Sequence, residues 1–316
     1  MTGTGAVRRV AAAVASGALI ASMLMAATTA QAAQPRVVNA CANPAAIDIA
    51  SGLELQTSLR QARDGDILCL TQDITIQPIG LDVPVLLNAS VTIDGAGHAI
   101  RPSASGEGLY FDLSGDSADS LVLANIEFPG GVLRNNNSAV RLLGSQNRTD
   151  TLTVSNVTYF NLRTIGSAAG VMGFGTALHA DLMGTVDIEG LYVSNTLAQA
   201  FAPVVIAANT IALRQSSFHF NRVLHNMANT EALSACPRQL ALSPFTGPRA
   251  GAASLEAGTS ITITDSIFWN NTADCGGALY LTQLATAADT NTRASITDSS
   301  IAYNAALVRG GGGIYA

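Results

Sequence analysis

Two aspartates occupy the same place in neighbouring repeats of this sequence, and their carboxylates could support metal binding or acid–base chemistry. Asp265 comes two positions after the run Ile261-Thr262-Ile263, and Asp298 comes two positions after Ala294-Ser295-Ile296. If these runs are neighbouring strands, the two residues lie about 5 Å apart. Such a pair could bind Ca²⁺ or provide the acid and base for cleaving a glycosidic bond. The alternative, that both residues cap tight turns, is favoured, so no catalytic residue and no cofactor is predicted.

A second candidate is a row of side chains on the outer face of the folded chain. Aromatic side chains arranged on a flat β-surface can bind sugar rings, and neighbours of inward residues point outward. The alternative, a plain sheet surface with paired tyrosines, is favoured. The residues expected to point inward are Leu178, Val205, Leu255, Leu279 and Ile314. The predicted ligand-binding stripe consists of their neighbours His179, Ile206, Glu256, Tyr280 and Tyr315.

Other polar residues lack the spacing that a metal or catalytic site requires. The histidines have no ligand partner at short spacing, which is typical of surface or turn residues. Asp181, Asp187 and Glu189 are close in sequence, but no neighbouring repeat offers matching carboxylates. The histidines are His98, His179, His219 and His225.

The elements that would position these residues repeat along the chain. Apolar-x-apolar runs start at 91, 121, 152, 186, 211, 261 and 294, at intervals of 25 to 34 residues except one of 50. Each run is followed by a turn residue, in most repeats Gly, Asn or Asp, and then by an apolar residue. The turn residues are Gly95, Asn125, Asn156, Gly190, Gln215, Asp265 and Asp298. The apolar residues are Phe128, Tyr159, Val193, Phe218, Phe268 and Ile301.

This period, with short strands and no repeated helix, predicts an all-β fold, a right-handed parallel β-helix formed by residues 34–316. Leu53–Ala62 has helical periodicity and is expected to cap the N-terminal end of the stack. The long interval predicts an insertion loop over about 222–258. Because the chain ends on Gly310–Gly313 and three further residues, its last coil is expected to be open, or the chain to be a fragment.

The first 33 residues have the features of a secretion signal. Arg8-Arg9 precede an apolar stretch, and Ala30-Gln31-Ala32 is a cleavage site. The protein is therefore expected to be secreted or on the bacterial outer surface, with no membrane span after signal removal. An even number of cysteines in an exported chain favours disulfides. Since distant coils cannot meet, the expected pairs are Cys41–Cys69 and Cys236–Cys275.

Two motifs within residues 260–282 resemble a known family. Phe268-Trp269-Asn270-Asn271 contains Phe-x-x-Asn, and Gly276-Gly277-Ala278-Leu279 follows it. The pairing resembles the repeats of polymorphic outer membrane proteins, first described in chlamydiae, within the pectate-lyase-like superfamily of right-handed parallel β-helices. The resemblance implies that the Phe stacks in the core, that the Asn satisfies turn backbone groups and that the glycines form a corner. It also implies export and, in relatives, a surface-displayed passenger with adhesive roles.

The net charge of −6 disfavours a nucleic-acid partner. The resemblance favours a non-catalytic passenger of adhesin type that binds a glycan or a host or cell-surface protein. We expect a monomer unless the open last coil stacks on another. One alternative is a polysaccharide lyase or glycoside hydrolase, and another is a truncated passenger without a function of its own.

Overall fold

The computed structural model describes residues 39–78, 84–115, 118–134, 138–165, 176–199, 202–224, 250–273, 276–284, 292–307 and 311–316. The predicted signal segment and both Cys236 and Cys275 lie outside the described residues. The chain from Pro35 onward forms one compact unit. No helix in the described part of the chain is long and apolar enough to cross a membrane.

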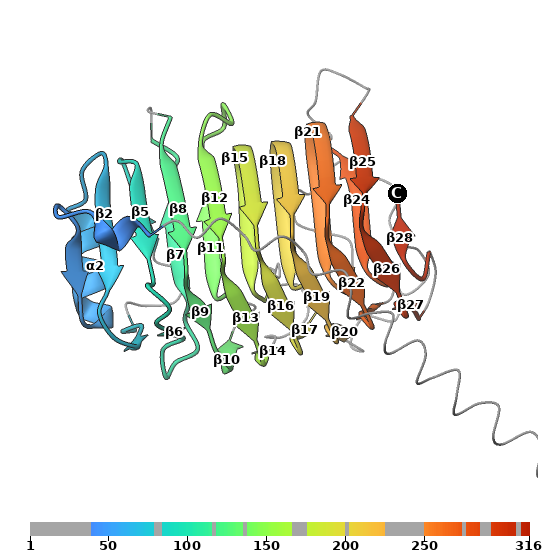
Figure 1. Cartoon of the computed structure of the whole chain (residues 1–316), viewed down its shortest axis with the longest axis horizontal. Coiled ribbons are helices and arrows are strands. Elements are labelled where there is room, and N and C mark those ends of the chain that lie inside the picture. The colour runs from blue at the N-terminus through green and yellow to red at the C-terminus, as the bar shows by residue number, and fades with distance from the viewer. Residues whose placement is uncertain are drawn as a thin grey trace, which may run out of the picture. The chain divides into compact units, whose positions relative to one another are not determined.

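Parallel strands stacked coil upon coil form this unit, as Figure 1 shows from the N-terminal α2 to the C-terminal β28. A 14-stranded sheet contains β1 (Ile47–Ile49), β2 (Asp66–Leu70), β4 (Val85–Leu86), β5 (Val91–Asp94), β7 (Leu109–Asp112), β8 (Ser120–Ala124), β11 (Val140–Leu143), β12 (Thr151–Ser155), β15 (Leu178–Glu189), β18 (Val204–Arg214), β21 (Ala253–Thr264), β24 (Leu279–Gln283), β25 (Arg293–Thr297) and β28 (Ile314–Tyr315). Two further sheets have six strands each. The predicted parallel β-helix is therefore confirmed.

The first six-stranded sheet, called the β9–β26 sheet, consists of β9 (Glu127–Phe128), β13 (Thr158–Phe160), β16 (Tyr192–Ser194), β19 (Ser217–His219), β22 (Ile267–Trp269) and β26 (Ser300–Ala302). The second, the β10–β27 sheet, consists of β10 (Gly131–Arg134), β14 (Leu162–Ile165), β17 (Leu197–Gln199), β20 (Arg222–Leu224), β23 (Thr272–Ala273) and β27 (Ala305–Ala306). A small pair, β3 (Ile74–Thr75) and β6 (Ile100–Arg101), lies near the N-terminal end.

The repeat alignment predicted from sequence is the strand register of the structure. The first residues of the apolar runs pair directly with one another from coil to coil: Val91, Leu121, Leu152, Val186, Ile211, Ile261 and Ala294. The predicted turn position has positive φ at Asn125, Asn156, Gly190, Gln215, Asp265 and Asp298. The first coil differs, because Ala96 and Gly97 take positive φ there and Gly95 does not.

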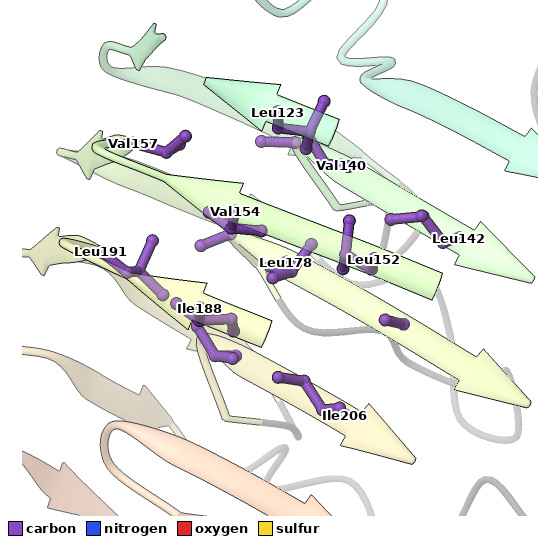
Figure 2. Packing of buried hydrophobic residues seen from close by; sticks show 14 of the residues in the cluster. Leu123, Val140, Leu142, Leu152, Val154, Val157, Leu178, Ile188, Leu191 and Ile206 are labelled. Atoms are coloured by element: carbon purple, nitrogen blue, oxygen red, sulfur yellow. The ribbon is translucent and has the colours of Figure 1, made fainter. Parts of the chain in front are cut away.

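Apolar side chains from successive coils fill the interior, as Figure 2 shows for Leu152, Val154 and Ile188. The predicted aromatic positions also stack inside the coils. The Phe128 and Tyr159 rings are 4.7 Å apart and nearly parallel, and those of Phe218 and Phe268 are 4.9 Å apart. Strand spacing in a parallel sheet sets this distance, so aromatics in adjacent coils stack in pairs, and Val193 separates the two pairs.

A row of asparagines joins the last coils: Asn221 and Asn271 are buried and end the Phe-x-x-Asn motifs, and the half-buried Asn304 takes the same position in the next coil. The Asn221 side-chain Nδ2 donates to Asn271 Oδ1 at 2.9 Å, and Asn271 Nδ2 donates to Asn304 Oδ1 at 2.9 Å. Each amide also bonds the backbone: Asn271 Nδ2 donates to the Phe218 carbonyl at 3.0 Å, and Asn271 Oδ1 accepts from Asn221 N at 3.1 Å. The predicted role of these asparagines in satisfying turn backbone groups is confirmed.

Helix α2 (Gly52–Arg60) and a disulfide stabilise the N-terminal end. The Ser51 hydroxyl accepts from Glu54 N at 3.1 Å, which caps the first turn of the helix. Leu55 and Leu59 point into the core and are buried, as the helical periodicity predicts. The Cys41–Cys69 disulfide forms as expected. A 3₁₀ turn, η1 (Ala40–Ala42), carries Cys41.

The predicted corner at Gly276-Gly277 leaves no room for a side chain. A Cβ on Gly277 would lie 1.9 Å from the Gly312 carbonyl oxygen, so only glycine fits this corner.

The segment predicted as an insertion, about 222–258, is strand at both ends, because Arg222–Leu224 is β20 and β21 begins at Ala253. The middle of this segment, residues 225–249, lies outside the described residues.

Candidate functional site

Five ring-bearing side chains lie together on the outside of the β9–β26 sheet and form what we call the aromatic surface: Tyr192, His219, Phe220, Trp269 and Tyr303. Strand alternation explains their direction. Phe218 and Phe268 point into the core, so the next residues, His219 and Trp269, point outward and pair with each other in register.

Trp269 lies at the centre of the aromatic surface. Its ring is 4.8 Å from that of Phe220 and 5.9 Å from that of Tyr303, and both contacts are edge-to-face. His219 lies 6.3 Å from Trp269 and 5.6 Å from Tyr192, which extends the cluster across three neighbouring strands. Partial burial lowers the pKa of His219, so its imidazole is neutral at pH 7.

The outer rings of this surface are open to solvent. Tyr303 is 69% exposed, Phe220 49% and Tyr192 41%. The other outward side chains of β16, β19, β22 and β26 carry no charge: Ser194, Ser217, Ile267, Ser300 and Ala302. From β16 to β26 the described part of this sheet therefore presents an uncharged, ring-rich patch, whereas β9 at its far edge carries the exposed Glu127.

Two of these rings occupy backbone positions that normally suit another residue type. Phe220 and Tyr303 have φ values of 55° and 58°. The corresponding turn position in other coils is asparagine, at Asn161, Asn195 and Asn270, which tolerates the left-handed conformation much better than a bulky residue. Since neither ring is buried, no packing gain in the core offsets this cost. Strained conformations of this kind are typical of functional sites.

The predicted ligand-binding stripe is only partly assembled. His179, Tyr280 and Tyr315 belong to one outward column of the 14-stranded sheet, and the Tyr280 and Tyr315 rings stack at 5.1 Å. His179 and Tyr280 are each only 5% exposed. Tyr280 packs in a small apolar cluster with Ala202 and Ala250, so most of its ring is covered.

Ile206 was wrongly placed in that stripe, and Glu256 lies on the predicted outer face but in a neighbouring column. Ile206 pairs with Leu255 and is 1% exposed in the core, whereas Val205 points outward beside His179. The sequence alignment was off by one residue in this coil, and such a shift moves every side chain to the other face. Glu256 does point outward, but it pairs with Thr282, two residues beyond Tyr280.

A polar cluster adjoins His179 on the same outer face. The Arg141 guanidinium lies 4.1 Å from the centre of the Tyr110 ring, and Arg141 pairs in register with His179. Burial, helped by the Arg141 charge, lowers the pKa of His179 to about 3. Asp181, two residues along β15, has a raised pKa because it is largely buried. A neutral imidazole, a cation and a carboxyl group that holds its proton more tightly therefore lie close together.

The paired aspartates are turn residues in successive coils. Asp265 and Asp298 have φ values of 49° and 51°, and Asp265 N donates to the Thr297 carbonyl at 3.3 Å. No group of three or more His, Cys, Asp or Glu among the described residues could hold a metal ion. On the 14-stranded sheet, Arg214 Nη2 lies 2.6 Å from Asp187 Oδ1 and 3.9 Å from Glu189 Oε2. The two carboxylates therefore form surface ion pairs with Arg214.

Comparison of the chain with protein-family models, with curated proteins and with solved structures gave no match. The parallel β-helix is established by the strand pairing, and the candidate sites by their geometry.

Sequence reasoning did not find the aromatic surface, although two signals were present. Trp269 is the only tryptophan of the chain. Phe220 and Tyr303 replace asparagine at the third position of their motifs, which is visible once Phe218-His219-Phe220-Asn221 is aligned with Phe268-Trp269-Asn270-Asn271. An aromatic residue at an exposed turn position is the departure that would have identified the site.

Proposed function

We propose that this protein is an exported β-helix with repeats of the polymorphic outer membrane protein type, and that it acts as a non-catalytic binding protein of adhesin type. The aromatic surface is its binding site. The observation that carries this proposal is the exposed edge-to-face cluster around Trp269. Exposed apolar patches of this kind mark interaction sites, and Trp and Tyr are enriched in binding hot spots.

The fold does not need these rings on its outside. The inward residues build the core, and the asparagine row and the glycine corner shape the turns. Three of the five rings of the aromatic surface are exposed, and Phe220 and Tyr303 occupy a backbone conformation that disfavours bulky residues. Binding an external partner would account for both features.

The test measures attachment of the purified chain to bacterial and host cell surfaces and to a glycan array. Trp269→Ala should abolish attachment, whereas Leu86→Ala and Val132→Ala should not, because those exposed apolar residues lie on other sheets. Circular dichroism would verify that each variant is folded. Equal attachment by Trp269→Ala and the unmodified chain would contradict the proposed function.

An enzyme that acts on polysaccharides is a second candidate, and the cluster of Arg141, His179 and Asp181 favours it. A carboxyl group with a raised pKa can serve as a general acid, and the arginine could bind a substrate carboxylate. Incubation with neutral and acidic polysaccharides, followed by assays for reducing ends and unsaturated products, tests this activity. Any product formed should disappear with Asp181→Asn.

A further inference from the structure

We infer that the ligand of the aromatic surface is an uncharged glycan chain, which lies across neighbouring coils with sugar rings stacked on Trp269 and the rings beside it. This inference rests on the proposed function and adds the chemical class of the ligand. The class follows from the charge, the size and the polar groups of the surface.

The charge of the surface fits a neutral ligand. Its described outward side chains are aromatic, hydroxyl-bearing or aliphatic, and His219 is neutral at pH 7. Arg222, at the border in β20, is the nearest charged residue along the chain after Phe220. An acidic glycan normally requires several cations to offset its charge, and this chain has a net charge of −6. A neutral sugar needs only apolar ring faces and hydrogen-bonding groups at their edges.

The size of the surface fits an oligosaccharide better than a folded protein. A stable protein interface involves about 20–30 residues on each side, whereas the aromatic surface has the five residues named above. From β16 to β26 the surface crosses neighbouring strands spaced about 4.8 Å apart, a span of about 14 Å. A short run of sugar rings could contact Tyr192, Trp269 and Tyr303 together within this length.

Polar groups are present where sugar hydroxyls would need partners. The phenol groups of Tyr192 and Tyr303 are on exposed residues, and the exposed side chains of Asn195 and Asn270 lie in turns at the edge of the rings. Most small-ligand sites combine apolar contact area with a few such polar groups that orient the ligand.

The chain itself offers variants that remove rings without disturbing the fold. Phe220→Asn and Tyr303→Asn install the residue that other coils carry at this left-handed turn position. Because asparagine tolerates that conformation, the double variant should fold at least as stably as the unmodified chain. Leu86→Ala, an exposed apolar residue on the 14-stranded sheet, is the matched control.

The assay follows the fluorescence of Trp269, the only tryptophan, during titration with cellohexaose, xylohexaose, mannohexaose and maltohexaose, and with oligogalacturonate. We expect at least one neutral oligosaccharide to shift the emission with saturable binding that added salt leaves unchanged. The double asparagine variant should bind it about tenfold more weakly or worse, and Leu86→Ala should bind it unchanged.

Two outcomes overturn the inference, and they differ in what they imply. If no neutral oligosaccharide binds, but oligogalacturonate or a cell-surface protein binds through the same rings, the ligand class is wrong and the proposed function survives. If the double asparagine variant and the unmodified chain attach equally to every ligand and cell surface, the aromatic surface is not the site, and the proposed function fails with it.

Discussion

Replacing Asn271 with alanine should destabilise the C-terminal coils far more than its size suggests. Asn271 is fully buried and connects three coils through its side-chain amide. Its Oδ1 accepts from the backbone and side chain of Asn221, and its Nδ2 donates to the Phe218 carbonyl and to Asn304. Alanine removes all four bonds at once.

The magnitude follows from the groups that remain buried after the substitution. The Asn221 backbone N–H loses its acceptor, and a buried unsatisfied donor costs about 1–3 kcal/mol. Asn221 Nδ2 retains the Val193 carbonyl, and Asn304 Oδ1 retains the Asn271 backbone N–H, so these losses are smaller. We expect a loss of about 2–4 kcal/mol in the free energy of unfolding. For a chain of this size, the melting temperature should fall by on the order of 10 °C.

Thermal unfolding followed by far-ultraviolet circular dichroism measures this loss. Thr262→Ala on the exposed face of β21 is the control and should cost no more than about 1 kcal/mol. Asn271→Asp is more informative, because it keeps the shape but offers a carboxylate to the acceptors Phe218 O and Asn304 Oδ1. Its buried carboxyl should have a raised pKa, so this variant should lose stability as the pH rises from 4 to 7. If Asn271→Ala and Thr262→Ala have the same melting temperature, the asparagine row does not stabilise the coils.

Three other outcomes are expected. Gly277→Ala should detach the last coil, detected as faster proteolysis near the C-terminus, because its Cβ would lie 1.9 Å from the Gly312 carbonyl oxygen. Replacing both Cys41 and Cys69 with serine should cost about 3 kcal/mol, measured by thermal unfolding, because the disulfide closes a loop with a sequence separation of 28. Since the pKa of His179 is lowered to about 3, only the unfolded state takes up this proton between pH 6.5 and 3, so stability should fall as the pH drops through that window. His179→Gln should flatten that dependence in melting experiments between pH 4 and 7.

Sequence predicted the fold because the same physical requirement recurs in every coil. An inward apolar residue, a left-handed turn and a second inward residue are needed each time, so Leu152, Asn156 and Tyr159 repeat a pattern set by Leu121, Asn125 and Phe128. Each copy adds evidence for the alignment. The register followed directly, although the first-coil turn and the ends of the insertion were misplaced.

The sites were harder to predict because they depend on single residues rather than on repetition. An offset of one residue before β18 was enough to exchange Val205 and Ile206 between the outer face and the core. The covering of Tyr280 by Ala202 and Ala250 depends on segments outside its own strand, and strand alternation carries no information about them. Outward direction was therefore predictable only where the register was right, as for Tyr280, and even there exposure was not.

Departures from the repeat are the most useful sequence signal of function in a β-helix. Where every coil needs the same residue type for the same backbone conformation, a costly replacement has to be offset elsewhere, in stability or in binding. Phe220 and Tyr303 replace asparagine in a left-handed turn, and both rings lie beside Trp269 and face solvent. They contribute nothing to the core that could offset the strain. The same coils keep Asn221 and Asn304 one position later, where each bonds Asn271 of the coil between them and the fold does require the amide. The contrast between these adjacent positions separates residues that build the coil from residues that we propose bind its ligand.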